Sequence, residues 1–185
     1  MNRHQRVHII FLLLIIFSMI RCGPTPVEKI DFIVSFNDTI NDRVGYKNLN
    51  GIIIIPPGKY LRCFTDTFKT YAIVIKEHTG FVAIDRQETV LYEVFPFDNG
   101  PDEPSEGLFR ILVDKKIGYA DSLTGKVVIK PQFDCAWPFE NGVAEVSTDC
   151  KTQADGEHSV WVSENWFYID RTGKIVEKPL TTTLK

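Results

Sequence analysis

The stretch from Ile117 to Val146 constrains the fold of this chain more than any other. It reads IGYADSLTGKVVIKPQFDCAWPFENGVAEV: an apolar strand, a turn, a β-branched strand and an aromatic corner. Three β-branched residues at 127–129, between two lysines, favour a short pleated strand. Gly125 can adopt a positive φ and close a hairpin onto the preceding strand. We expect the second strand to end at Pro131, because proline has no N–H to donate to a sheet.

The same order of elements recurs along the chain. Residues 44–60 contain a Gly-Tyr strand, an Asn-Gly turn, an apolar strand and a proline stop. Residues 80–95 form a degraded copy without the turn glycine, and residues 166–176 a further copy. When aligned on Gly45, Gly80, Gly118 and Phe167, the copies are 35, 38 and 49 residues apart. Irregular spacing of this kind is typical of repeats whose loops vary while their strands persist.

A further apolar strand precedes each copy, at residues 32–36, 71–75, 107–113 and 142–146. Three short strands per unit cannot bury a core alone, so neighbouring units must pack together. The sequence therefore predicts an all-β protein, an antiparallel meander of about four three-stranded repeats with no substantial helix after the amino-terminal segment. The predicted domain spans residues 30–178, with units near 30–70, 71–105, 106–141 and 142–178, and residues 179–185 form a loose tail.

These residues resemble the WG-repeat (KWG) family of bacterial β-repeat proteins. The likeness rests on Glu106-Gly107-Leu108, on residues 116–121 and 125–134, and on Phe139. It covers roughly residues 30–178 and is strongest from 106 to 176. The tryptophan that precedes the glycine in the family is replaced by Val44, Thr79 and Ile117, and Trp166 precedes a phenylalanine, Phe167. The resemblance implies a β-repeat scaffold used for interactions, with no catalytic residue and no cofactor to transfer.

The amino terminus is typical of an export signal. Arg3 and Arg6 precede an apolar run over residues 7–20, and a Cys-Gly-Pro sequence beginning at Cys22 ends it. This layout resembles a bacterial lipoprotein signal over residues 1–21, in which Cys22 becomes the lipidated first residue of the mature chain and residues 22–29 form a linker. Arg21 departs from the small residue of the family pattern. Plain secretion and an uncleaved anchor remain as alternatives.

The charge balance argues against a nucleic acid partner. The 185-residue chain has a net charge of −3, and beyond residue 21 it carries 18 basic and 24 acidic side chains. Binding to phosphates rests on a basic face, which this balance does not supply.

The cysteines allow a disulfide and do not indicate a metal site. Cys63, Cys135 and Cys150 remain after Cys22, so at least one is free. A pair between Cys135 and Cys150 is compatible with export, but the sequence alone leaves the pairing open. Neither a Cys-x-x-Cys pair nor a Cys/His group of zinc-site spacing occurs.

Few residues suggest chemistry. The acidic stretch 98–103 does not fit a calcium-loop template, and we interpret it as a solvated turn. His158 lies near acidic residues at the tip of the longest insertion, Ser147–Asn165, where a surface histidine is expected. Trp137 and Trp166 are expected to pack in the core. Trp161 lies in the insertion and, with His158, marks it as an interaction loop.

The function predicted from the sequence is that of a non-enzymatic module of the bacterial cell envelope. It would be exported, held at the membrane through a lipid on Cys22, and bind a protein or glycan partner through the insertion. No catalytic, cofactor or metal residue is assigned. An all-β hydrolase or metal-dependent enzyme is one alternative, and it would need convergent acidic or metal-binding side chains. A purely structural envelope scaffold is another.

Overall fold

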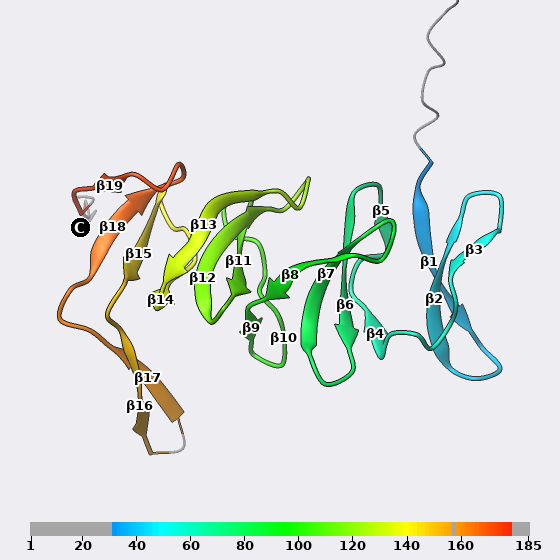
Figure 1. Ribbon diagram of the computed structural model, residues 1–185, viewed down its shortest axis with the longest axis horizontal. Coiled ribbons are helices and arrows are strands. Elements are labelled where there is room, and N and C mark those ends of the chain that lie inside the picture. Colours follow the sequence, from blue (N-terminus) through cyan, green and yellow to red (C-terminus); the bar gives the residue numbers. More distant parts are fainter. Residues whose placement is uncertain (1–30, 157, 179–185) are drawn as a thin grey trace, which may run out of the picture. The chain divides into compact units, whose positions relative to one another are not determined.

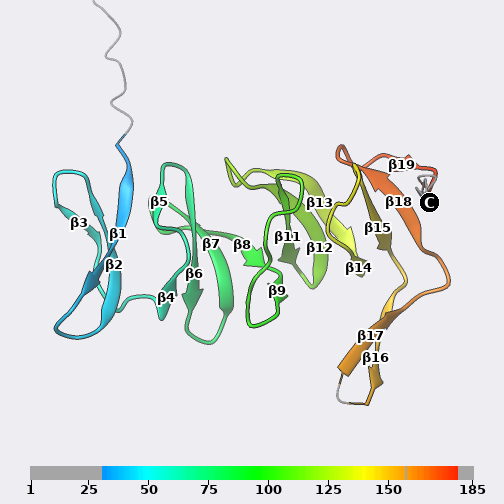
Figure 2. The same cartoon turned by 180° about the vertical axis from the view of Figure 1, so that it is seen from behind.

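The computed structural model describes residues 31–156 and 158–178, which form strands and turns and no helix. The predicted all-β class is confirmed. Within these residues no helix could cross a membrane. The strands follow one another in antiparallel pairs (Figures 1 and 2). Their bounds are β1 (Ile33–Asp38), β2 (Arg43–Asn48), β3 (Ile53–Ile55), β4 (Arg62–Cys63), β5 (Thr67–Phe68), β6 (Tyr71–Lys76), β7 (Gly80–Asp85), β8 (Val90–Val94), β9 (Pro96–Phe97), β10 (Gly100–Pro101), β11 (Leu108–Val113), β12 (Lys116–Asp121), β13 (Val127–Phe133), β14 (Cys135–Ala136), β15 (Val143–Ser147), β16 (Lys151–Asp155), β17 (His158–Val162), β18 (Phe167–Asp170) and β19 (Ile175–Val176).

Three-stranded antiparallel meanders recur along the described residues. β1-β2-β3, β6-β7-β8 and β11-β12-β13 are each formed from consecutive strands. The fourth, β15-β18-β19, has the β16–β17 hairpin inserted after its first strand. β8 also pairs with β11, so the second and third meanders join in one seven-stranded sheet.

An asparagine or aspartate ends the middle strand of each meander and stabilises the turn that follows. These residues are Asn48, Asp85, Asp121 and Asp170, which are 37, 36 and 49 residues apart. Each side chain accepts hydrogen bonds from backbone N–H groups of its own turn, as Asx turns do. The hairpin insertion accounts for the longest interval.

The turns correct one predicted alignment. Three residues before Asn48, Asp85, Asp121 and Asp170 lie Gly45, Val82, Gly118 and Phe167, respectively. Val82, and not Gly80, is therefore equivalent to Gly45 and Gly118. Gly80 instead opens β7 opposite Lys76, with a φ of 93°. It serves the turn between β6 and β7, which is a different task from that of a glycine within a strand.

Gly118 lies under a bulge of the neighbouring strand. The register of β12 and β13 shifts opposite it. A Cβ atom at this position would lie 2.5 Å from the carbonyl oxygen of Ile129 and 2.6 Å from the nitrogen of Pro131. The backbone approaches so closely that only glycine fits. Gly45 has the same role in the first meander, where a Cβ would lie 2.7 Å from the carbonyl oxygen of Ile55.

The prediction that the β-branched strand beginning at Val127 ends at Pro131 was wrong. β13 continues through Pro131 to Phe133, which pairs with Ile117. The bulge is the physical reason, because it takes the proline out of the regular ladder, where an N–H donor would be required.

The hydrophobic clusters lie between successive meanders. In β7, Val82 and Ile84 belong to a cluster with Tyr46 of the first meander, whereas Ala83 belongs to one with Phe109 of the third. Successive side chains of a strand point to opposite faces, so a middle strand packs against a neighbour on each side. β12 follows the same rule and supplies a further cluster shared with the fourth meander. Each meander therefore depends on its neighbours for a core.

Candidate functional site

The insertion between β15 and β18 folds as a two-stranded hairpin. β16 and β17 pair over five positions, from Lys151 opposite Val162 to Asp155 opposite His158. The hairpin extends beyond the ends of β15 and β18 in both views (Figures 1 and 2). All residues of β16 are exposed. An isolated two-stranded hairpin is marginally stable in water, so contacts at its base must hold it.

A disulfide forms the first of these contacts. Cys135 and Cys150 are bonded, with 5.7 Å between their Cα atoms. Cys135 lies in β14 and is buried, whereas Cys150 precedes β16. The pairing that the sequence left open therefore ties the start of the hairpin to the core.

A hydrogen-bond network around Asp149 is the second contact that holds the base of the hairpin. The Ser163 hydroxyl donates to Asp149 Oδ1 at 2.5 Å, the Ser147 hydroxyl donates to the same oxygen at 2.8 Å, and the Asn165 amide donates to Oδ2. The donors come from both legs of the hairpin. Because they favour the charged carboxylate, these bonds from Ser163, Asn165 and Ser147 lower the pKa of Asp149 to about 2.

The base of the hairpin also carries a row of aromatic rings. The centroid of Trp161 lies 5.8 Å from that of Phe95 and 5.2 Å from that of Trp137, both in edge-to-face arrangements. Trp161 is partly buried against the cluster between the third and fourth meanders. Ring pairs of this geometry are favourable beyond the area they bury. Trp161, singled out in the sequence as part of an interaction loop, thus packs against Trp137.

The prediction that Trp137 packs in the core was wrong, since 46% of its surface is exposed. Its backbone is fixed instead: its N–H donates to the Glu145 carbonyl at 3.0 Å, and its carbonyl accepts from the Tyr119 hydroxyl at 2.6 Å. Burial raises the pKa of Tyr119, which keeps this hydroxyl protonated as a donor. The core position is filled by Phe139, whose ring packs 4.8 Å from that of Tyr119.

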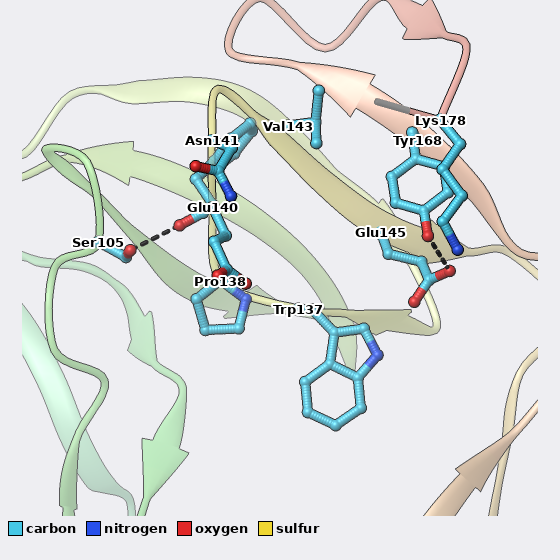
Figure 3. Close-up of a pocket in the computed structure, with 10 residues that line it drawn as sticks. Ser105, Trp137, Pro138, Glu140, Asn141, Val143, Glu145, Tyr168 and Lys178 are labelled. Carbon is cyan, nitrogen blue, oxygen red and sulfur yellow. Dashed lines mark hydrogen bonds between the residues drawn. The ribbon is translucent and has the colours of Figure 1, made fainter. Parts of the chain in front are cut away.

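Beside Trp137 the surface is hollowed into a pocket of about 460 Å³. In Figure 3, Pro138, Glu140 and Asn141 lie on one side of it and Glu145, Tyr168 and Lys178 on the other, with the Trp137 indole at one end. The lining combines aromatic rings, carboxylates, an amide and an ammonium group. The full lining is Ser105, Trp137, Pro138, Phe139, Glu140, Asn141, Val143, Glu145, Tyr168 and Lys178.

The polar groups of the pocket are partly paired with one another. The Tyr168 hydroxyl donates to Glu145 Oε1 at 2.7 Å, as Figure 3 shows. The Lys178 ammonium lies 5.5 Å from the centroid of the Tyr168 ring, within cation–π range. Glu140 is exposed. Two carboxylates against one ammonium give the pocket a negative balance.

The acidic stretch 98–103 is not wholly a solvated turn, because Asp102 is buried in an ion pair with Arg110. The Arg110 Nε donates to Asp102 at 3.1 Å, and its Nη1 donates to the Ala136 carbonyl at 3.2 Å. The guanidinium also lies 4.3 Å from the centroid of the Phe95 ring. The Asp102 carboxylate is therefore paired with Arg110, and the Arg110 guanidinium packs on the ring of Phe95, the first ring of the aromatic row.

The other residues singled out in the sequence are only partly brought together. His158 begins β17 at the far end of the hairpin, and its side chain lies outside the described part of the molecule. Trp166 is partly buried, not fully in the core as expected. Cys22, the signal segment and the tail 179–185 lie outside the described residues. In the described ranges, no group of three or more His, Cys, Asp or Glu side chains is arranged to hold a metal ion.

Sequence reasoning missed the pocket. Glu145 and Tyr168 meet because β15 pairs with β18 and places these two residues opposite each other, although 19 residues separate the two strands in the chain. Trp137 lies between the buried Ala136 and the buried Phe139, although it is itself exposed. Nothing in the linear sequence indicated its outward direction.

Comparison with known proteins agrees with the resemblance seen in the sequence. Residues 117–149, from β12 to just beyond β15, match the family model of the WG containing repeat. No curated protein and no solved structure matches the chain.

Proposed function

We propose that the chain, in which residues 117–149 match the WG containing repeat, is a non-enzymatic interaction module of the bacterial cell envelope. Its partner is a protein or a glycan, held at the surface beside the inserted hairpin. Cys22 carries the lipid that anchors the mature chain to the membrane.

The observation that carries this proposal is the exposed Trp137 at the base of the hairpin. Nearly half of this large aromatic side chain meets solvent, although its ring packs against Trp161 and its backbone is held by two hydrogen bonds. Tryptophan is enriched at the centres of binding sites, where it supplies a large contact area. A rigid ring loses little conformational entropy on binding.

Site-specific photo-crosslinking in intact cells tests the interaction. A photoactivatable residue at Gln153 in the exposed strand β16 is expected to give a discrete adduct, and one at Ile40, 90% exposed in a turn of the first meander, is the control. Trp137→Ala should reduce the adduct from position 153. Equal adducts from both positions, or none from the hairpin, would count against the proposal.

Metabolic labelling with a palmitate analogue tests the anchor separately. The native chain is expected to take up label, and Cys22→Ala is expected to take up none. Equal labelling of the two chains, or no labelling of either, would refute the lipid anchor without bearing on the hairpin.

A further inference from the structure

The pocket beside Trp137 has the size and the chemical character of a small-ligand site. Its volume of about 460 Å³ falls within the range of about 300–1,000 Å³ that such sites occupy. It is lined mainly by apolar and aromatic surface, with a few polar groups that converge on it (Figure 3). The following inference rests on the proposed interaction function and names the ligand of that surface.

The apolar wall of the pocket is held in place before any ligand arrives. Two backbone hydrogen bonds position Trp137, to the carbonyl of Glu145 and from the hydroxyl of Tyr119. The edge-to-face contact with Trp161 restrains the indole itself. Because little ordering remains to be done, an apolar face that stacks on Trp137 binds at low entropic cost.

The polar wall faces this ring with unused hydrogen-bonding capacity. Glu145 Oε1 accepts from the Tyr168 hydroxyl, whereas Oε2 accepts no hydrogen bond from the described residues. A carboxylate has about four acceptor positions and an ammonium has three donors. Glu145 and Lys178 can therefore accept from, and donate to, a ligand that presents several hydroxyl groups.

The charges of the pocket select among ligands. Glu140 and Glu145 outnumber Lys178, so phosphates, nucleotides and acidic sugars are disfavoured. A neutral sugar ring has an apolar face of C–H groups and a rim of hydroxyls, which matches an indole beside a carboxylate and an ammonium. An extended peptide would instead bind along a strand edge, whereas Glu145 and Tyr168 lie on paired strands.

We propose that this pocket binds a neutral saccharide. Trp137 stacks on the apolar face of one sugar ring, Glu145 accepts hydrogen bonds from its hydroxyls, and Lys178 donates to them. Trp161 acts as a positioning residue for Trp137.

The test uses the full chain, purified in a zwitterionic detergent that contains no sugar. Chitotriose, cellotriose and maltotriose are titrated separately to millimolar concentrations while tryptophan fluorescence and saturation-transfer NMR are recorded. At least one of them is expected to saturate the signal. Trp137→Ala should weaken its binding by about tenfold or more, which corresponds to about 1.4 kcal/mol. Glu145→Gln, which keeps one acceptor oxygen, should weaken it by a smaller factor.

Phe97→Ala is the matched control, because this exposed aromatic side chain lies outside the lining of the pocket and its loss should leave sugar binding unchanged. Thermal unfolding of each variant verifies folding. Absence of saturable binding by all three sugars, or binding that Trp137→Ala leaves unchanged, overturns the proposal.

These outcomes can be separated from failure of the proposed function. If no sugar binds while the adduct from position 153 persists and depends on Trp137, the partner is a protein and the saccharide proposal alone is refuted. If both the sugars and the adduct fail, the interaction function is refuted with it.

Discussion

Replacing Gly118 by alanine is expected to destabilise the fold strongly. The new Cβ would lie 2.5, 2.6 and 2.8 Å from backbone atoms of Ile129 and Pro131, whereas real Cβ atoms essentially never come closer than 3.0 Å. Rotation of a side chain cannot relieve contacts with backbone, so β13 must move away from β12. Overpacking of this kind costs about 1–3 kcal/mol, and each weakened ladder hydrogen bond adds about 1 kcal/mol.

We therefore expect Gly118→Ala to lower the free energy of unfolding by about 2–4 kcal/mol. In a protein of this size each kcal/mol shifts the melting temperature by about 2–4 °C. Urea unfolding followed by tryptophan fluorescence, with a thermal scan by circular dichroism, measures both quantities.

Gly100→Ala is the matched control, because its Cβ would meet only the Phe97 carbonyl oxygen at 3.7 Å, an ordinary contact. It should change the stability by less than about 0.5 kcal/mol. If Gly118→Ala unfolds at the same urea concentration as Gly100→Ala, the close approach of the bulge to Gly118 is refuted.

Three further predictions concern the surroundings of the pocket. Cys150→Ser opens a disulfide between residues 15 apart and should lower the free energy of unfolding by about 3 kcal/mol in non-reducing urea titrations; an unchanged midpoint would show that the bond contributes nothing. Asp102→Ala leaves the Arg110 charge buried and should cost about 3–5 kcal/mol in the same assay, part of which the double variant with Arg110→Met should recover; a double variant no more stable than the single one would contradict this. The carboxylate of Asp149, with its pKa lowered from 3.8 to about 2, stabilises the hairpin base fully above pH 4 and loses this effect as the pH falls towards 2; the acid-induced change in tryptophan fluorescence should be reduced in Asp149→Asn, and an identical titration in that variant would contradict the assignment.

Much of the fold was predictable because its signals are local. Runs of β-branched residues separated by glycine, asparagine or aspartate turns specify strands and hairpins within a few residues of one another. The error at Gly80 arose because a turn glycine and a strand glycine look alike in a sequence, although one provides a positive φ and the other provides space. The error at Pro131 arose because a bulge depends on the partner strand, which local propensity does not describe.

The candidate site was less predictable because its parts are far apart in the chain. Trp161 was singled out as a contact residue, but its packing against Phe95 and Trp137 depends on where the hairpin base folds back. The pocket residues Glu145 and Tyr168 meet only through strand pairing.

The sequence by itself determined the all-β class, the recurrent three-stranded meander, the position of the insertion and the resemblance to WG repeats. Each of these follows from residue order over fewer than about fifty residues, the range of a repeat. Only the tertiary structure decided which strand faces are shared between neighbouring meanders, which cysteines pair, and that Trp137 points to solvent while Phe139 fills the core. Alternation along a strand specifies which side chains share a face. The packing of the next meander decides which aromatic side chain of the segment after β13 can be buried in the core. The proposed binding surface lies where Trp137 remains exposed because Phe139 fills the core.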